Sequence, residues 1–324
     1  MRRLGGCPVS RKRKRKLRSV QYLQYLGARA VLEMARVLPL SVLYAAAGVL
    51  GTALYWFAPR RRGIALNNIR EAFHGEIDEA SLRALVRRSF AAFFCTAVEV
   101  AKLRLFLTDR TDLGDPRIYP ESLRILFTKA QRIHEQSHGC IFVTPHLGNW
   151  ELLPHVSAKV GIPLAVVVRP LDNPYLERLL YSKRAVNGQI VIPKRNAFFT
   201  LQKLLQQGKS IGMLPDQSTK KGILIDFMGR GAMTTPVPAV LALSYQRPVV
   251  VVACCRNDQS LGFEGFVSDP IWPSQHYTSE KAEIIRITTA IHKEMETVIR
   301  RFPEQYLWMH NRWKVYRTKK QFLD

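Results

Sequence analysis

The second half of the chain alternates short apolar runs with helical patterns, and this alternation constrains the fold most. From Gly139 onward, runs typical of buried strands are separated by segments whose apolar residues recur every three or four positions. The strand-like runs are residues 140–144, 164–168, 189–192, 210–214, 224–227 and 248–255, and the helical patterns are residues 174–186, 197–206, 238–245 and 280–301. Such alternation is typical of a parallel or mixed sheet covered by helices on both faces. We therefore predict an α/β fold with a central mixed sheet flanked by helices.

A histidine follows the first strand-like run, at a position where α/β proteins place their chemistry. The stretch 141–153 reads IFVTPHLGNWELL, in which the first three residues predict a buried strand and His146 lies on the loop that leaves it. Asn149 is a good N-cap for a helix beginning just after it, with Glu151 in the first turn. Glu151 can reach back to one imidazole nitrogen and leave the other free to accept a proton. We predict that His146 is a general base oriented by Glu151.

The spacing alone leaves other interpretations of this histidine open. The chain has eight histidines and 25 acidic residues, and a second pair of the same spacing, His74 and Glu79, has no strand before it. A loop histidine bonded to the backbone is the plainer alternative. A metal site shared with His155 is disfavoured, because Pro154 interrupts the helical spacing and no His-Glu-x-x-His motif is present. We therefore expect no metal and no cofactor.

The chain is strongly basic, and its charge is unevenly distributed. Lys and Arg number 49 against 25 Asp and Glu, which gives a net charge of +24. Residues 1–70 hold fifteen of the basic residues and one acidic residue, and residues 11–16 read RKRKRK, a run that repels itself into disorder. A surplus of this size predicts an anionic partner. A nucleic-acid arm, a localisation signal and a membrane-surface tether all fit the run, and the segment after it favours a membrane.

An uncharged segment of 22 residues, from 37 to 58, reads VLPLSVLYAAAGVLGTALYWFA. Arg36 precedes it, three arginines follow at 60–62, and Tyr55 and Trp56 suit a membrane interface. A helix of this length just crosses a bilayer core. Crossing, lying in the membrane plane and packing as a core helix all remain open, because basic residues on both sides set no orientation. We predict an N-terminal membrane-anchoring helix, with the catalytic part on the cytoplasmic face.

Three regions follow from these patterns. We expect a basic disordered tail over residues 1–20, a membrane-associated helical segment over residues 21–62, and one catalytic domain over residues 63–324. The five cysteines are odd in number and form no Cys-x-x-Cys pair, which indicates a reducing compartment. The three cysteines in or beside strand-like runs are expected to be small core residues rather than catalytic thiols.

Seven sequence blocks resemble, in order, those of the bacterial lipid A late acyltransferases. These enzymes belong to the glycerolipid acyltransferase superfamily, whose mark is a histidine followed five positions later by an acidic residue. The blocks are RRRGIALNNIREAF (60–73), HLGNWE (146–151), VVRPLDNP (167–174), LPDQ (214–217), IDFMG (225–229), TTPVPAVLAL (234–243) and QYLWMHNRWK (305–314). The resemblance covers roughly residues 20–317, and several blocks in the right order are far more specific than the histidine pair alone.

The resemblance implies an enzyme that transfers a fatty acyl group from an acyl-carrier-protein or CoA thioester to a hydroxyl of a phosphorylated lipid A precursor, at the bacterial inner membrane. The implied catalytic pair is His146 and Glu151, and no covalent enzyme intermediate is needed because thiolate is already a good leaving group. The implied substrate-binding residues are Asn149, Arg169, Asn173, Asp216, Gln217 and Arg312. The implied partners are the acyl carrier protein or acyl-CoA donor, the lipid A precursor and membrane lipid, and no nucleic acid is expected.

Some of these residues also have a chemical rationale of their own. The thioester carbonyl becomes an oxyanion during transfer, and backbone N–H groups near Gly148 and Asn149, or Arg169, can supply its donors. Arg169 instead suits a phosphate, because its guanidinium forks onto two oxygens, or it is a surface charge. Asp216 follows a strand-like run, so it faces the same sheet edge and orients Arg169 or the acceptor, or caps a turn. Arg312 either contacts a headgroup or belongs to an amphipathic C-terminal segment.

Two competing functions stay open at this point. An acyltransferase acting on a glycerophosphate or on a phosphatidylinositol mannoside shares the same blocks loosely. A non-enzymatic basic protein that binds membranes or nucleic acid would explain the RKRKRK run. Against that second alternative, the sequence shows no zinc-finger, RRM-like or helix-turn-helix signature.

Overall fold

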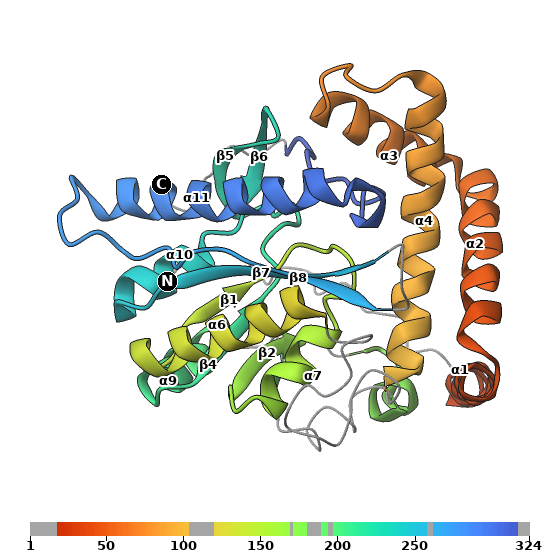
Figure 1. Ribbon diagram of the computed structural model, residues 1–324, viewed down its shortest axis with the longest axis horizontal. Helices are drawn as coiled ribbons and strands as arrows, with labels where there is room; N and C mark the ends of the chain where they lie inside the picture. Colours follow the sequence, from red (N-terminus) through yellow and green to blue (C-terminus); the bar gives the residue numbers. More distant parts are fainter. Residues whose placement is uncertain are drawn as a thin grey trace, which may run out of the picture.

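A mixed sheet forms the centre of the protein (Figure 1). The structure is a computed structural model, and it describes residues 18–103, 120–168, 171–179, 189–193, 197–257 and 262–316. Within these residues the main sheet has six strands, in the order β3 (Ile190–Pro193), β2 (Leu164–Val168), β4 (Ser210–Met213), β1 (Ile141–Val143), β7 (Val249–Arg256) and β8 (Phe263–Val267). The neighbouring strands from β3 to β7 are parallel, and β8 is antiparallel to β7.

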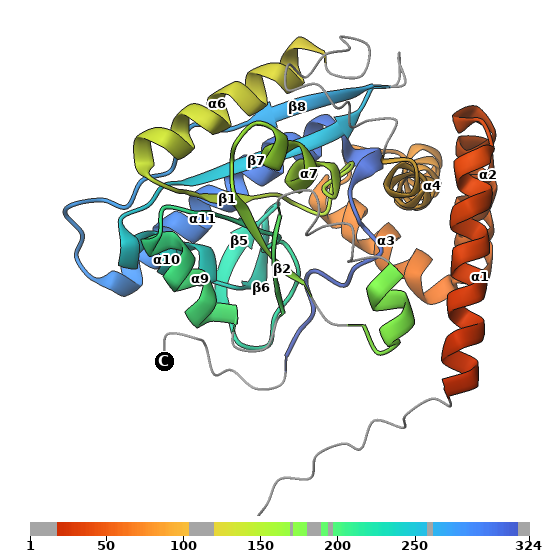
Figure 2. The same ribbon diagram turned by 90° about the horizontal axis from the view of Figure 1, so that it is seen from below.

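Helices cover both faces of the sheet, as Figures 1 and 2 show. One face carries α6 (Glu121–Ser137) and α7 (Leu152–Lys159), and the other carries α9 (Ala197–Gln206), α10 (Val237–Tyr245) and α11 (Glu280–Arg301). Alternate residues of one strand point to opposite faces. Phe142 of β1 accordingly belongs to the apolar cluster with α6 and α7, whereas Ile141 and Val143 belong to the cluster with α10 and α11. The predicted α/β fold with a mixed sheet flanked by helices is confirmed.

The structure differs from the expected strands at two places, and a third expected element is only partly described. The run at 224–227 lies outside the main sheet, because β5 (Ile223–Phe227) pairs with β6 (Arg230–Thr234) in a separate antiparallel hairpin. The prediction missed β8, whose sequence FEGFV places a charge and a glycine inside the strand. Gly265 is needed there, because a Cβ would lie 2.6 Å from the Ser122 carbonyl oxygen of α6. The expected helix over 174–186 is helical at 174–179, and residues 180–186 lie outside the described residues.

Four helices form the described N-terminal part of the chain, residues 18–103: α1 (Arg18–Val37), α2 (Leu40–Phe57), α3 (Pro59–Ala72) and α4 (Glu79–Ala101). Asp78 begins α4 by accepting hydrogen bonds from the backbone N–H groups of Ala80 and Ser81. The helix α2 packs along α4 through a stripe of residues at every fourth position: Leu43, Ala47, Gly51 and Tyr55. At Gly51 the helices approach so closely that a Cβ would lie 2.5 Å from the Ala91 backbone.

The expected regions can be compared with the N-terminal helices of the structure. Within the uncharged segment 37–58, residues 40–57 form α2, and Val37 is the last residue of α1. Among the described residues α2 is the one helix long and apolar enough to cross a membrane, and 22% of its 18-residue window is buried inside the protein. The boundary at 62/63 falls inside α3, because Pro59 begins a helix that continues to Ala72. The helix α1 begins at Arg18, two residues before the expected end of the tail, and residues 1–17 lie outside the described residues.

Candidate active site

His146 and Asp216 lie on two neighbouring loops at the carboxyl edge of the sheet. Strand β1 ends at Val143 and strand β4 at Met213, and the two strands are paired side by side in parallel. The backbone N–H of Thr144 extends this pairing by donating to the Met213 carbonyl at 3.0 Å. Parallel neighbours send their following loops to the same edge, so residues about 70 positions apart meet there.

The imidazole of His146 is held between two side chains of the β4 loop. Its Nδ1 lies 2.6 Å from Asp216 Oδ1, and its own backbone N–H donates to Asp216 Oδ2 at 2.8 Å. On the other side, Gln217 Nε2 lies 3.1 Å from His146 Nε2. A carboxylate can only accept, so the Nδ1 proton faces Asp216 and the Nε2 lone pair accepts from Gln217. This tautomer is the one in which Nε2 can take a proton from a substrate hydroxyl.

The electrostatics of the pair suit a general base. Burial disfavours the charged form of His146, but the charge and hydrogen bond of Asp216 outweigh burial, so the pKa of His146 is raised above its usual value. Burial would raise the pKa of Asp216, but His146 and the nearby Arg312 lower it to about 2. The Asp216 carboxylate is therefore ionised at neutral pH although the residue is only 2% exposed.

The hydrogen-bond partner of His146 differs from the residue that the sequence predicts. The sequence predicts that Glu151 holds the imidazole, but in the structure the carboxylate of Asp216 accepts the hydrogen bond from Nδ1. Helix α7 begins at Leu152 with Glu151 at its N-cap position, so the Glu151 backbone is already turning into the helix. Glu151 still acts on His146 through its charge, which raises the histidine pKa after the contributions of Asp216. The ring of Trp150 lies 5.3 Å from the imidazole.

The turn after His146 is fixed by backbone hydrogen bonds. The Gly148 N–H donates to the Gln305 carbonyl at 3.2 Å, and the Asn149 N–H donates to the Cys254 carbonyl at 2.7 Å. Gly148 has φ +59°, and a Cβ there would lie 2.2 Å from the Cys254 oxygen, so only glycine fits this approach. Because both N–H groups already donate to protein carbonyls, these two do not point at a reacting oxyanion in this structure, and the other donors suggested by the sequence stay predictions.

Asn149 and Arg312 have buried structural partners. Asn149 is 0% exposed, and its side chain accepts from the Leu152 N–H at 3.0 Å while donating to Glu99 at 2.9 Å. Arg312 is 1% exposed and donates to the Met233 carbonyl at 3.0 Å and to Thr234 Oγ1 at 2.5 Å. Both side chains are therefore buried and hydrogen-bonded to protein groups next to the site. Neither has the exposed surface that a contact with a substrate or a lipid headgroup requires.

Asn173 holds the N-terminal helix. Its Nδ2 donates to the Gln21 carbonyl of α1 at 2.8 Å, and its Oδ1 accepts from the Tyr175 N–H at 3.0 Å. Asn173 is 7% exposed, so the expected substrate contact is replaced by a link between α1 and the segment after β2. The Tyr22 and Tyr175 rings, 5.6 Å apart, strengthen that link. Arg169, the expected phosphate ligand, lies outside the described residues.

The C-terminal segment brings two further side chains that sequence reasoning missed. Burial, followed by the charge and hydrogen bond of Asp216, raises the pKa of Tyr306 well above its usual value. Burial lowers the pKa of His310, which also feels the charges of Asp216, His146 and Arg61. Both lie inside the block QYLWMHNRWK, but no spacing rule relates that block to the histidine loop. The sequence therefore indicated that this block matters, but not that Tyr306 and His310 are the residues of the block that reach the site.

The thiols of the three cysteines in or beside the central sheet are buried away from the histidine. Cys140, Cys254 and Cys255 are each 0% exposed, and burial raises the pKa of all three thiols. A thiol needs a lowered pKa to act as a nucleophile at neutral pH. These cysteines are core residues.

Comparisons with known proteins identify the family of the chain. Residues 10–315 match the family described as bacterial lipid A biosynthesis acyltransferase. The chain is 25% identical over 299 residues to a lipid A biosynthesis lauroyltransferase of Escherichia coli K12, covering 90% of this chain and 92% of that protein. It is 26% identical over 187 residues to a lipid A biosynthesis palmitoleoyltransferase of the same organism, covering 57% of this chain and 58% of the relative. A phosphatidylinositol mannoside acyltransferase of Mycolicibacterium smegmatis is 22% identical over 184 residues, covering 55% of this chain and 58% of the relative. The match over nearly the whole chain shows that this protein is an acyltransferase and belongs to the bacterial lipid A biosynthesis acyltransferase family.

Proposed function

We propose that the protein transfers a fatty acyl group from a thioester donor to a hydroxyl of a phosphorylated lipid A precursor, with His146 as the general base. The observation that carries this proposal is the pairing of His146 Nδ1 with the buried Asp216 carboxylate at 2.6 Å, which leaves Nε2 as the proton acceptor. Membership of an acyltransferase family supports acyl transfer as the reaction, and it argues against the alternative of a non-enzymatic basic protein. The names of the two lipid A relatives support the acceptor class.

The proposed reaction needs one base and no covalent enzyme intermediate. Nε2 of His146 takes the proton of the acceptor hydroxyl while the hydroxyl oxygen attacks the carbonyl carbon of the thioester. The carbon–sulfur bond then breaks, and the departing thiolate receives the proton back from the imidazolium. Asp216 stabilises that imidazolium between the two steps. The Gln217 amide lies against Nε2 of His146, so the acceptor hydroxyl takes the place of this amide, whose N–H is then available to the oxyanion.

Positive charge beside the site supports a phosphorylated acceptor. Helix α3 begins with three arginines at 60–62, and it is held against the C-terminal segment by Asn68, which donates to the carbonyls of Trp308 and His310. Arg61 is exposed and donates to the Met309 carbonyl at 3.2 Å, close enough to His310 to influence its titration. Exposed guanidinium groups here suit phosphate oxygens. Acyl carrier protein and CoA thioesters are both anionic, so the same charge attracts either donor.

The acceptor can be tested directly by removing its phosphates. Purified protein with acyl-carrier-protein thioester should add one acyl group to a bisphosphorylated lipid A precursor. The dephosphorylated precursor should be used at least about tenfold less well, because charge-assisted hydrogen bonds are lost. The product mass, measured by mass spectrometry in a time course, gives both rates.

The same assay decides between acceptors. Acyl-CoA in place of the carrier-protein thioester identifies the donor. Equal rates with phosphorylated and dephosphorylated precursor would contradict phosphate recognition. Transfer to a mannosylated phosphoinositide or to glycerol 3-phosphate, with none to lipid A precursors, would replace the proposed acceptor; the Mycolicibacterium relative makes the first of these the alternative to include.

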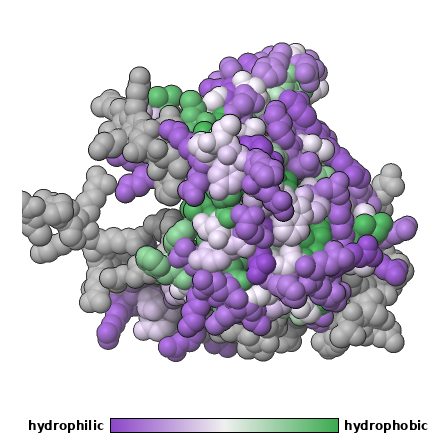
Figure 3. Space-filling view, turned by 90° about the vertical axis from the view of Figure 1, so that its left-hand side faces the viewer, coloured by the Kyte–Doolittle hydropathy of each residue, from purple (hydrophilic) through white to green (hydrophobic). Residues whose placement is uncertain are grey.

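We also propose that α1 and α2 bind the membrane. Both helices lie at the edge of the molecule beyond α4 (Figures 1 and 2). They expose large apolar side chains, including Leu23 at 65%, Val49 at 70% and Phe57 at 87%. The opposite end of the molecule presents mainly hydrophilic side chains (Figure 3). Apolar surface flanked by basic residues is typical of a face that contacts anionic lipid.

The full-length protein should therefore sediment with membranes and require detergent for extraction. Replacing Val49 and Phe57 together by aspartate should move at least part of the protein to the soluble fraction, because two charges would enter the lipid contact. Phe199→Asp is the matched control, since Phe199 is also 73% exposed but belongs to α9 on the sheet. Release of the unaltered protein by a salt wash alone would contradict insertion of apolar side chains and leave the basic residues as the tether.

A further inference from the structure

A buried carboxylate lies directly behind the turn that carries His146. Glu99, on the last turns of α4, is 0% exposed. Its Oε1 accepts from the Tyr44 hydroxyl of α2 at 2.9 Å and from Nε of Arg256, and its Oε2 accepts from Asn149 Nδ2 at 2.9 Å and from Arg256 Nη2 at 3.1 Å. One carboxylate thus joins helix α2, the last residue of β7 and the histidine turn.

The buried Glu99–Arg256 pair is not explained by its contribution to the stability of the fold alone. Burying a carboxylate and a guanidinium costs desolvation energy that their attraction only partly offsets, so apolar residues of similar volume often stabilise a core as well or better. The pair is fully committed to hydrogen bonds: Arg256 also donates to Thr96 Oγ1, and its backbone exchanges hydrogen bonds with the side chain of Gln305. Such a network fixes one arrangement of the elements that it joins.

The elements it joins are those that hold His146. Thr96, one helical turn before Glu99, donates to the Gly148 carbonyl at 2.8 Å. Asn149 connects Glu99 to the start of α7 by accepting from the Leu152 N–H. On the other side of the turn, the Leu307 N–H donates to the His146 carbonyl at 3.0 Å. The backbone from His146 to Asn149 is therefore clamped between α4, the end of β7 and the C-terminal segment.

We propose that Glu99 is a positioning residue for acyl transfer: together with Arg256 it fixes Asn149, and through Asn149 it holds the turn that aims His146 at the acceptor hydroxyl. This inference rests on the proposed role of His146. Glu99 touches no reacting atom in this account. Its contribution is the placement of Nε2, and a misplacement of about 1 Å costs on the order of a hundredfold in rate.

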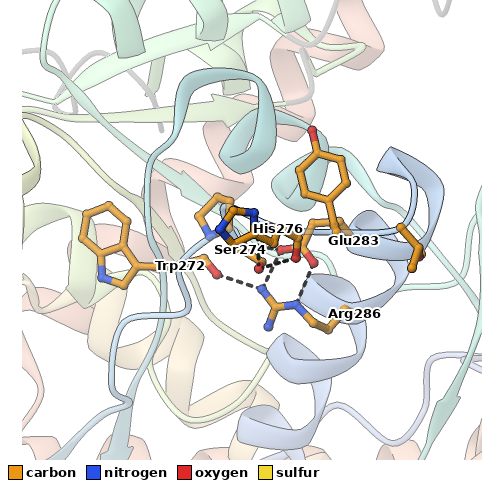
Figure 4. Close-up of a pocket in the computed structure, with 9 residues that line it drawn as sticks. Trp272, Ser274, His276, Glu283 and Arg286 are labelled. Atoms are coloured by element: carbon orange, nitrogen blue, oxygen red, sulfur yellow. Dashed lines mark hydrogen bonds and ion pairs between the residues drawn. The ribbon is translucent and has the colours of Figure 1, made fainter.

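The test compares two isosteric substitutions of equally buried glutamates. Glu99→Gln supplies one acceptor oxygen where three side chains donate, so at least one contact to Asn149 or Arg256 is lost. Glu283→Gln is the matched control: Glu283 is 2% exposed, pairs with Arg286 at 2.7 Å and accepts from the Ser274 N–H at 2.7 Å. It lines a cavity of about 700 Å³ at the start of α11, built around Trp272 and His276 (Figure 4).

Two measurements are made on both variants: kcat and KM with the acyl-transfer assay, and amide hydrogen exchange of the peptide covering residues 146–152. Glu99→Gln should lower kcat at least about tenfold with KM within about twofold, and it should speed exchange in that peptide. Glu283→Gln should change the free energy of unfolding by about as much as Glu99→Gln does. It should leave kcat and the amide exchange of residues 146–152 unaltered. A purely structural role for Glu99 would lower the melting temperature without lowering kcat per folded molecule.

A second variant guards against misfolding of Glu99→Gln. Asn149→Ser keeps a side-chain oxygen that can accept from the Leu152 N–H but is too short to reach Glu99, and it leaves the Glu99–Arg256 pair intact. It should reproduce the loss of kcat and the faster exchange. Unchanged exchange at 146–152 in both variants, or unchanged kcat in both, would overturn the inference. Absence of acyl transfer by the unaltered protein would refute the proposed function instead, and the exchange measurement would still decide whether Glu99 holds the turn.

Discussion

Replacing His146 by alanine should lower kcat for acyl transfer by at least about a hundredfold while leaving the protein folded, because a positioned base contributes about 10²–10⁴ to such rates. The imidazole is the group whose Nε2 is presented at the carboxyl edge of the sheet, and its ring is only partly buried, with 18% of the side chain exposed. Truncation therefore removes a proton acceptor without opening the core. Product mass against time, with the circular dichroism spectrum of each variant, measures both effects.

His134→Ala is the matched control for this substitution. His134 is also partly buried and also bonds through Nδ1, to Ser210 Oγ at 2.8 Å, but it lies on α6 rather than on the histidine loop. Its removal should leave kcat within about threefold of the unaltered protein, as expected for a residue that contacts no reacting atom. Turnover at the unaltered rate in folded His146→Ala would contradict the assignment of the base.

Replacing Asp216 by asparagine should have an effect of similar size, with kcat reduced by roughly a thousandfold where an acid holds a catalytic imidazole in its reactive tautomer. The side chain keeps its shape, so the loop should stay folded. The amide lacks the charge that stabilises the imidazolium, and its NH₂ group can donate to Nδ1 and move the proton to Nε2. The measurement is kcat together with KM, and KM should change little because Asp216 is buried beneath the imidazole.

The control for Asp216→Asn is a substitution of Arg312, a second buried charged residue near the site. Arg312→Lys replaces the planar guanidinium, which donates to the Met233 carbonyl and to Thr234, by a single ammonium group. This change should lower the free energy of unfolding and have little effect on kcat. If Asp216→Asn retained a kcat within about tenfold of the unaltered protein, the Asp216–His146 pair would be a structural hydrogen bond and not the catalytic pair.

The position of the site was predictable from sequence because it depends on local signals. The apolar run 141–143 predicts a strand, and a loop after a parallel strand opens at the carboxyl edge, which places His146 without any knowledge of its neighbours. The charge-free segment that becomes α2 is equally local. Both signals depend only on residues adjacent in the chain.

The partner of His146 was not predictable in the same way. Glu151 is five positions away and Asp216 is 70 positions away, yet Asp216 reaches Nδ1 because β1 and β4 are neighbours in the sheet. Strand order is set by packing of the whole domain, and the sequence of one loop contains no information about it. Resemblance had already placed Asp216 near the substrate, but only the sheet order assigns it to the imidazole.

The expected substrate-binding residues show a second limit. Asn149, Asn173 and Arg312 carry polar groups that suit a ligand and suit a buried structural contact equally well. The structure separates these alternatives by burial, since all three are at most 7% exposed and donate to protein oxygens. Gln217 differs from them, because its amide lies against the reactive nitrogen of His146.

The pH dependence of kcat tests the central claim most directly. A base works when it is neutral, so the acidic limb of the profile reports the pKa of His146 in the enzyme–substrate complex. Asp216 raises that pKa, so the limb of the unaltered protein should lie above pH 6.5. Asp216→Asn should move the limb to lower pH, and Glu151→Gln should move it in the same direction by less, since Asp216 contributes more than Glu151. A limb that stays in place in Asp216→Asn, or that moves further in Glu151→Gln, would contradict the account.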